Sequence, residues 1–64
     1  MLLFQKIKAM SRERGLTVRD VERACGFGNG TIRRWGTENV PSVERVAKVA
    51  GVFGVTIDEL MKED

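Results

Sequence analysis

The chain has no histidine and a single cysteine, Cys25. One cysteine cannot form a disulfide within the chain, and without histidine there is no Cys/His ligand set for a zinc ion. Acid-base catalysis by histidine is excluded too, and the sequence contains neither a paired-carboxylate signature nor a phosphate-binding loop. We therefore expect no metal, no cofactor and no enzymatic activity, and we expect Cys25 to be a small buried hydrophobe.

Long apolar runs are also missing. The opening segment MLLFQKIKAM is interrupted by Gln5, Lys6 and Lys8, so it resembles neither a membrane-spanning helix nor the apolar region of a signal peptide. This pattern favours a cytoplasmic protein with no membrane partner. With 64 residues the chain has room for one domain, 1–64, whose stability must come from helix packing.

Charge is unevenly distributed, although the formal net charge is only +2. Through Thr37, eight basic side chains face three acidic ones, a balance of about +5 by direct count. From Glu38 onward three basic side chains face six acidic ones, a balance of about −3. The first half is therefore suited to phosphate, and chance clustering of ordinary surface charge remains the alternative.

Capping residues and glycines divide the chain into helices. Thr17 and Asp20 form an approximate capping box, and Thr56 and Glu59 form one of the standard S/T-x-x-E type. Glycines that follow the apolar periodic segments supply the helix ends. The predicted helices cover residues 2–14, 17–26, 31–35, 42–54 and a segment that begins at Thr56.

Apolar residues at helical spacing predict one compact core. The predicted core positions are Leu3, Ile7, Met10, Val18, Val21, Cys25, Ile32, Trp35, Val43, Val46, Ala50, Phe53, Ile57 and Leu60. Trp35 is assigned to the core rather than to a stacking surface because it shares a helix face with Ile32. No strand-like alternation or internal repeat occurs, so the fold class is all-α.

The segment TVRDVERACGFGNGTIRRW predicts two short helices around a glycine-containing turn, a helix-turn-helix at about residues 17–36. Gly26 suits the turn because that position needs a positive φ. Phe27 is expected to close the apolar wedge between the two helices.

Two stretches, VRDVERACGFGNGTIRRW and PSVERVAKVAGVFGVTIDELM, resemble the phage-repressor and Cro-like family, the XRE-type helix-turn-helix proteins. The resemblance extends to Leu60, and GFGNGTIRRW is similar to small regulators of Gram-positive prophages and mobile elements. It implies a compact five-helix lambda-repressor-like domain. It also implies a transcription regulator that binds double-stranded DNA sequence-specifically, with the third helix in the major groove. A bare domain can act by occupying a promoter, which favours a repressor.

The chain departs from the family pattern at three positions. The family commonly has Gln at the position of Val18, Ala at that of Glu22 and Glu at that of Gly36. Val18 cannot supply a side-chain amide to DNA, and Gly36 cannot form an ion pair with an arginine of the first helix. We expect Glu22 to pair with Arg19 or Arg33.

Helical geometry turns Arg33 and Arg34 outward when Ile32 and Trp35 point inward. Arginine suits guanine and asparagine suits adenine, so Arg34 and Asn29 are expected to read bases, while Arg19 and Arg33 contact phosphate. The predicted DNA-binding residues are Thr17, Arg19, Gly28, Asn29, Gly30, Thr31, Arg33, Arg34, Thr37 and Asn39.

Simpler interpretations of three of these residues stay open. Thr17 is also explained as an N-cap alone, and Gly28 and Gly30 as turn formers. If the glycines instead serve DNA, their lack of bulk lets phosphate reach the backbone amides of residues 29–31. We then expect these amides to lack partners in the free protein, and Gly30→Ala to steady the turn.

A protein-interaction or antitoxin-like module on the same scaffold is the alternative function. For the DNA-binding function, one short recognition helix covers few bases, so we expect a homodimer on a near-palindromic operator with half-sites about 10 bp apart. The expected dimer contact lies around Val52, Ile57 and Met61.

Overall fold

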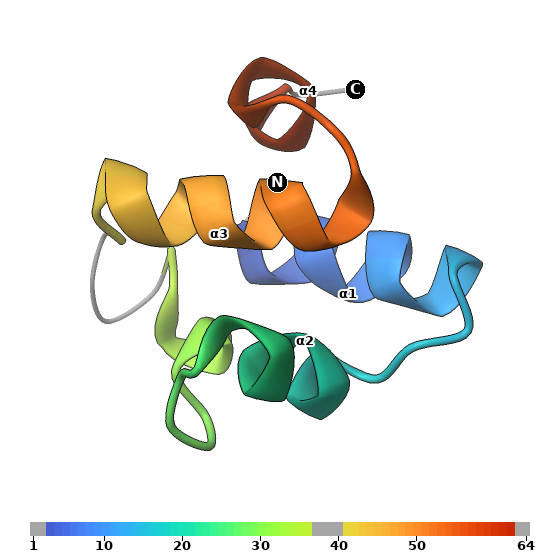
Figure 1. Ribbon diagram of the computed structural model, residues 1–64, viewed down its shortest axis with the longest axis vertical. Coiled ribbons are helices and arrows are strands. Elements are labelled where there is room, and N and C mark those ends of the chain that lie inside the picture. The colour runs from blue at the N-terminus through green and yellow to red at the C-terminus, as the bar shows by residue number, and fades with distance from the viewer. Residues whose placement is uncertain (1–2, 37–40, 63–64) are drawn as a thin grey trace.

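A computed structural model of the protein describes residues 3–36 and 41–62. The elements are α1 (Leu3–Glu13), α2 (Val18–Cys25), the 3-10 helix η1 (Ile32–Arg34), α3 (Val43–Phe53) and α4 (Ile57–Met61) (Figure 1). The predicted compact all-helical fold is confirmed. The predicted five helices are not, because this part of the chain contains four α-helices and only a three-residue 3-10 helix within residues 31–35.

The predicted capping boxes are both present. The Thr17 hydroxyl accepts from the Asp20 amide at 3.0 Å, and the Asp20 carboxylate accepts from the Thr17 amide at 2.9 Å. The Thr56 hydroxyl and the Glu59 carboxylate make the same reciprocal pair at the start of α4. Each box satisfies two amides that lack helical acceptors, so it fixes where the helix begins.

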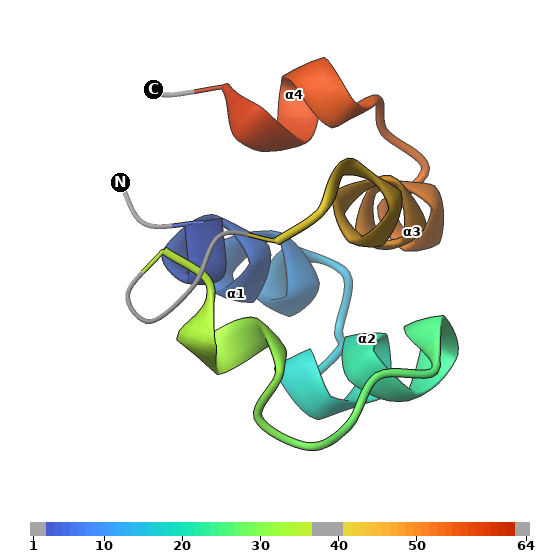
Figure 2. The same cartoon turned by 90° about the vertical axis from the view of Figure 1, so that its left-hand side faces the viewer.

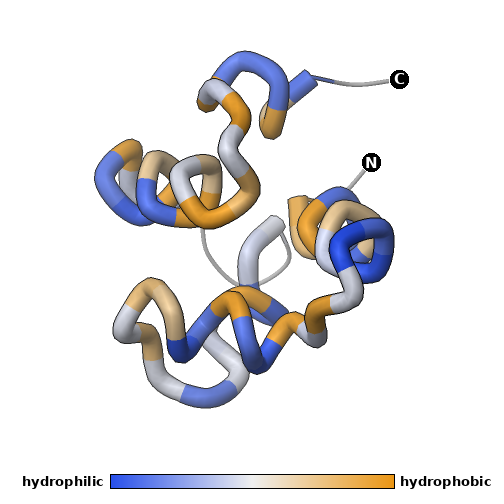
Figure 3. The backbone as a smooth tube through the Cα atoms, turned by 45° about the vertical axis from the view of Figure 1, so that its right-hand side comes forward, coloured by the Kyte–Doolittle hydropathy of each residue, from blue (hydrophilic) through white to orange (hydrophobic). Residues whose placement is uncertain are grey.

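The core lies where α1, α2 and α3 meet, and the elements form three levels. α2 and η1 lie on one side of α1 and α3, and α4 lies on the opposite side (Figures 1 and 2). Hydrophobic and hydrophilic residues alternate along the helices, as amphipathic helices require (Figure 3). The buried hydrophobic residues are Ile7, Val21, Ile32, Trp35, Val46, Val49, Ala50, Phe53 and Leu60.

Trp35 is 1% exposed, which confirms its predicted place in the core. Val43, by contrast, was expected in the apolar stripe of α3 but is 73% exposed. It occupies the first position of α3, at the edge of the stripe formed by Val46, Ala50 and Phe53. The stripe is completed instead by Val49, which is fully buried.

Arg14 ties the end of α1 to α3. Its Nη2 donates to the Phe53 carbonyl at 3.3 Å, and its guanidinium carbon lies 5.0 Å from the centroid of the Phe53 ring. This basic side chain of the first half therefore has a packing role.

Among the helices of residues 3–36 and 41–62, none is long and apolar enough to cross a membrane.

Candidate nucleic-acid interface

The recognition segment, defined here as residues 27–36, runs from the end of α2 through η1. Gly30 and Gly36 have φ values of 85° and 88°, so left-handed positions stand before and after η1 and limit it to a single turn. Ile32 and Trp35 are buried while Arg33 and Arg34 are exposed, as their spacing predicts. A 3-10 helix has 3.0 residues per turn, so the two arginines diverge by about 120°.

Aromatic contacts hold the recognition segment against the core. The Phe27 ring meets Trp35 edge to face, with 5.6 Å between the ring centroids. The Arg45 guanidinium of α3 also lies over the Phe27 ring, 5.8 Å from its centroid. Phe27 is therefore the wedge that its position predicts, and α3 supports the segment from behind.

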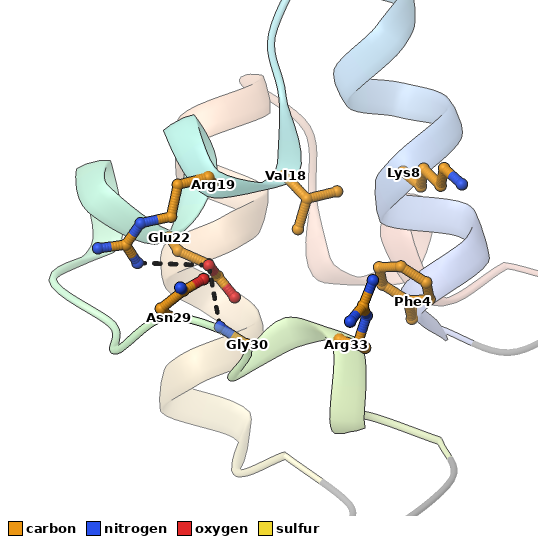
Figure 4. A pocket seen from close by; sticks show the side chains of 8 residues that line it. All are labelled: Phe4, Lys8, Val18, Arg19, Glu22, Asn29, Gly30 and Arg33. Atoms are coloured by element: carbon orange, nitrogen blue, oxygen red, sulfur yellow. Dashed lines mark hydrogen bonds and ion pairs between the residues drawn. The ribbon is translucent and has the colours of Figure 1, made fainter.

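The carboxylate of Glu22 reaches the recognition segment from α2 (Figure 4). Its Oε1 accepts from the Gly30 amide at 3.3 Å, and its Oε2 accepts from the Ile32 amide at 3.0 Å. The Thr31 amide donates to the Gly28 carbonyl at 3.3 Å. The expectation that the amides of residues 29–31 lack partners is therefore wrong at positions 30 and 31.

Arg19 is the partner of Glu22. Its Nη1 lies 3.4 Å from Glu22 Oε1 and 3.5 Å from the Phe27 carbonyl oxygen. Of the two partners that the sequence suggests for Glu22, the structure therefore shows Arg19. Arg33 lines the same cleft but makes no ion pair with Glu22 among the described residues (Figure 4).

An open cleft of about 310 Å³ separates α1 from the recognition segment. Its lining residues are Phe4, Lys8, Val18, Arg19, Glu22, Asn29, Gly30 and Arg33. Lys8 from α1, Arg19 from α2 and Arg33 from η1 contribute basic residues to the lining of this cleft, which also includes the acidic Glu22 (Figure 4). Lys8 is absent from the predicted residues, because only the folded chain brings α1 beside the recognition segment and no local motif marks it.

The sequence matches the model of a family described as helix-turn-helix over residues 7–60, from α1 into α4. The chain belongs to the XRE-type helix-turn-helix family. Members of this family are DNA-binding transcription regulators, so the cleft and the recognition segment lie in a DNA-binding protein. No curated protein and no solved structure matches the chain.

Apart from Gly28, the predicted site residues of this XRE-type protein fall into four groups. Arg19, Asn29, Gly30 and Arg33 meet at the cleft, while Arg34 is exposed on η1 outside the cleft lining. The hydroxyls of Thr17 and Thr31 bond to their own segments. Thr17 caps α2, and Thr31 donates to the Gly28 carbonyl at 2.8 Å. Thr37 and Asn39 lie outside the described residues.

Gly30 and Gly28 have different backbone requirements. Gly30 has a positive φ, so an alanine there is strained whatever the space around it. The expectation that Gly30→Ala steadies the turn is therefore wrong. A Cβ at Gly28 would meet only ordinary van der Waals contact, 3.7 Å from Thr31 Oγ1.

Two titratable groups near α2 have shifted pKa values. Hydrogen bonds from Thr17, first from its backbone amide and then from its side chain, hold the pKa of Asp20 below its ordinary value. Burial raises the pKa of the Cys25 thiol, which disfavours the reactive thiolate. Cys25 is half-buried rather than fully buried.

Within the described ranges, no group of three His, Cys, Asp or Glu residues could hold a metal ion.

Proposed function

We propose that this protein is a repressor that binds double-stranded DNA sequence-specifically, with η1 and the turn before it in the major groove. The observation that carries the proposal is the cleft, whose lining includes Lys8, Arg19 and Arg33 from three different elements. Three cations on one open face beside an exposed Asn29 suit a polyanion with readable base edges.

The side chains divide between bases and phosphates. Arg34 and Asn29 project from the recognition segment and have the donor geometry that matches guanine and adenine. Lys8, Arg19 and Arg33 surround the cleft and neutralise phosphates, which positions the protein on the duplex. Thr17, Gly28, Gly30, Thr31, Thr37 and Asn39 are the flanking contact candidates. Gly30 contributes the shape of the turn, since its amide already donates to Glu22.

Two copies bind a near-palindromic operator in the cytoplasm and repress by occupying the promoter. Half-sites lie about one helical turn, roughly 10 bp, apart. Met61 is 52% exposed, and Val52 and Ile57 are half-buried, so these residues offer apolar surface for the second copy. The origin of the protein in a Gram-positive prophage or mobile element stays a prediction.

The test is duplex binding measured across a salt series, on a site selected from a random pool. Log affinity is expected to fall linearly with log salt, with a slope of about −0.9 for each phosphate neutralised. A scrambled duplex of equal length should bind more weakly while retaining much of the salt dependence. Salt-insensitive binding to a protein, without duplex binding, would contradict the proposal and favour an interaction or antitoxin-like module.

A further inference from the structure

Glu22 carries a buried charge directly beneath the recognition segment, with 2% of the residue exposed. We propose that Glu22 is the positioning residue that sets DNA specificity, acting through the backbone of this segment rather than by touching DNA. The inference rests on the proposed DNA-binding function. Its two oxygens take different amides, those of Gly30 and Ile32, at 3.3 and 3.0 Å. Glu22 therefore caps η1 from a neighbouring helix.

The residue at the N-cap position of η1 does not supply a cap of its own. Thr31, at the N-cap position of η1, has φ −59° and ψ −49° and makes no side-chain cap hydrogen bond. Its hydroxyl is already turned to the Gly28 carbonyl. Without Glu22 the buried Ile32 amide would lack an acceptor, which is costly, so the turn would have to shift toward water.

The same carboxylate positions Arg19. Glu22 Oε1 lies 3.4 Å from Arg19 Nη1, and this oxygen also accepts from the Gly30 amide. One atom therefore couples the backbone that carries Asn29 to a cation of the cleft (Figure 4). Base reading needs side chains in fixed register, whereas contact with phosphate tolerates displacement. Loss of Glu22 should therefore harm specific binding more than nonspecific binding.

The substitution Glu22→Gln tests whether Glu22 sets DNA specificity, because it hardly changes the shape of the side chain. A glutamine side chain has one acceptor oxygen, so it cannot serve both amides as the carboxylate does, and it removes the negative charge. We expect the ratio of affinities for the selected and scrambled duplexes to fall about tenfold or more. Affinity for the scrambled duplex should stay the same or rise, because a negative charge near Arg19 is gone. A residue needed only for folding would lower both affinities together.

Glu13→Gln is the matched control. It makes the same chemical change on a side chain that is 74% exposed, in the hollow between α1 and α4. We expect both duplex affinities to stay within about twofold of the unchanged protein, as for most surface substitutions.

Amide hydrogen exchange in the free protein provides a second measurement that does not require DNA. Glu22→Ala keeps α2 favourable, because alanine is the best helix former. Exchange at Gly30 and Ile32 should accelerate about tenfold in Glu22→Gln and Glu22→Ala, while the core amides of Val21 and Val49 stay protected.

Three outcomes would overturn the positioning role. The first is a specificity ratio that Glu22→Gln leaves within twofold of the unchanged protein. The second is exchange that stays unchanged at Gly30 and Ile32, and the third is exchange that accelerates equally at Val21 and Val49, since that would be global unfolding. If the unchanged protein shows no salt-dependent duplex binding, the proposed function fails instead, and exchange still decides whether Glu22 caps the turn.

Discussion

The two halves of the helix-turn-helix, α2 and the recognition segment, obtain their shape in different ways. Thr17 caps the start of α2 with a capping box completed three residues later, and Gly26, with φ 77°, caps its end. η1 has no side-chain cap of its own and depends on Glu22, eight and ten residues before the amides it accepts from. A supporting helix can therefore be specified locally, while the segment proposed to read DNA takes its form from a tertiary contact.

The substitution with the largest expected effect on stability is at Trp35. It tests whether the core holds the recognition segment as firmly as it holds the helices. Trp35→Ala removes a side chain that is almost fully buried, and we expect a loss of about 3–5 kcal/mol in unfolding free energy. Urea unfolding followed by circular dichroism measures this loss. Val43→Ala, at an exposed apolar position, should stay within about 0.5 kcal/mol. A Trp35→Ala loss below about 1 kcal/mol would contradict the anchoring role.

A second comparison asks whether the arginines of α2 and of the recognition segment contribute differently to DNA binding. Arg34→Ala on η1 should cost about 1–3 kcal/mol on the selected duplex and relax preference at one base position. Arg19→Ala on α2 should weaken binding to all duplexes and reduce the salt slope by about one. Fluorescence anisotropy on matched and single-mismatch duplexes measures both. Equal weakening of every duplex by both variants would refute the division between base and phosphate contacts.

Alanine substitutions at Gly28 and Gly30 test the backbone conformation of the turn before η1. Gly30→Ala forces a Cβ into a left-handed conformation and should destabilise the protein by about 1–2 kcal/mol. Gly28→Ala has ordinary contacts and no positive φ, so its effect should be smaller. Paired thermal unfolding curves measure the difference. If Gly28→Ala proved the more harmful of the two, the described turn would be wrong.

Two threonines test local against tertiary capping. Thr17→Ala removes half of the capping box of α2 and should cost about 1 kcal/mol. Thr31→Ala removes no cap and should cost less, because Glu22 serves η1 instead. Chemical denaturation of both variants gives the comparison. An equal or larger loss for Thr31→Ala would show that η1 has a local cap after all.

The smallest effect concerns acid stability at the start of α2. The folded-state pKa of Asp20 is lowered by Thr17, so its stabilising contribution is complete above the unfolded pKa of about 3.9. That contribution is lost as the pH falls through the lower folded pKa. Asp20→Asn should therefore flatten the dependence of unfolding free energy on pH below about pH 4. Denaturation midpoints at pH 5 and below measure this, and parallel curves for both proteins would contradict it.

Much of the fold could be predicted from short-range signals. Thr17 with Asp20 and Thr56 with Glu59 marked two helix starts, and Gly26 and Gly54 marked two helix ends. These signals work because each pair satisfies terminal backbone groups within one turn of the chain. Val43 was misjudged, since periodicity places a residue on a helix face but does not say whether another element covers that end.

The candidate site was predicted less completely. The sequence identified the exposed Arg33 and Arg34, and it brought Arg19 and Glu22 together as a possible pair. It gave no signal for Lys8, which reaches the cleft only because α1 packs beside the recognition segment. It also predicted an α-helix at residues 31–35, because apolar spacing over so few residues does not distinguish an α-helix from a 3-10 helix.

Local sequence patterns predicted the helices whose ends carry their own caps and most of the apolar positions that form the core, with Val43 and Val49 as the exceptions. How residues 27–36 are held follows from the packing of the whole chain, because the Gly30 and Ile32 amides find their acceptor on α2. The two cases differ in the sequence separation between the hydrogen-bonded groups. A capping hydrogen bond spans three residues and is written in the local pattern, whereas the Glu22 carboxylate can reach Ile32 only after α2 and η1 have packed against a common core.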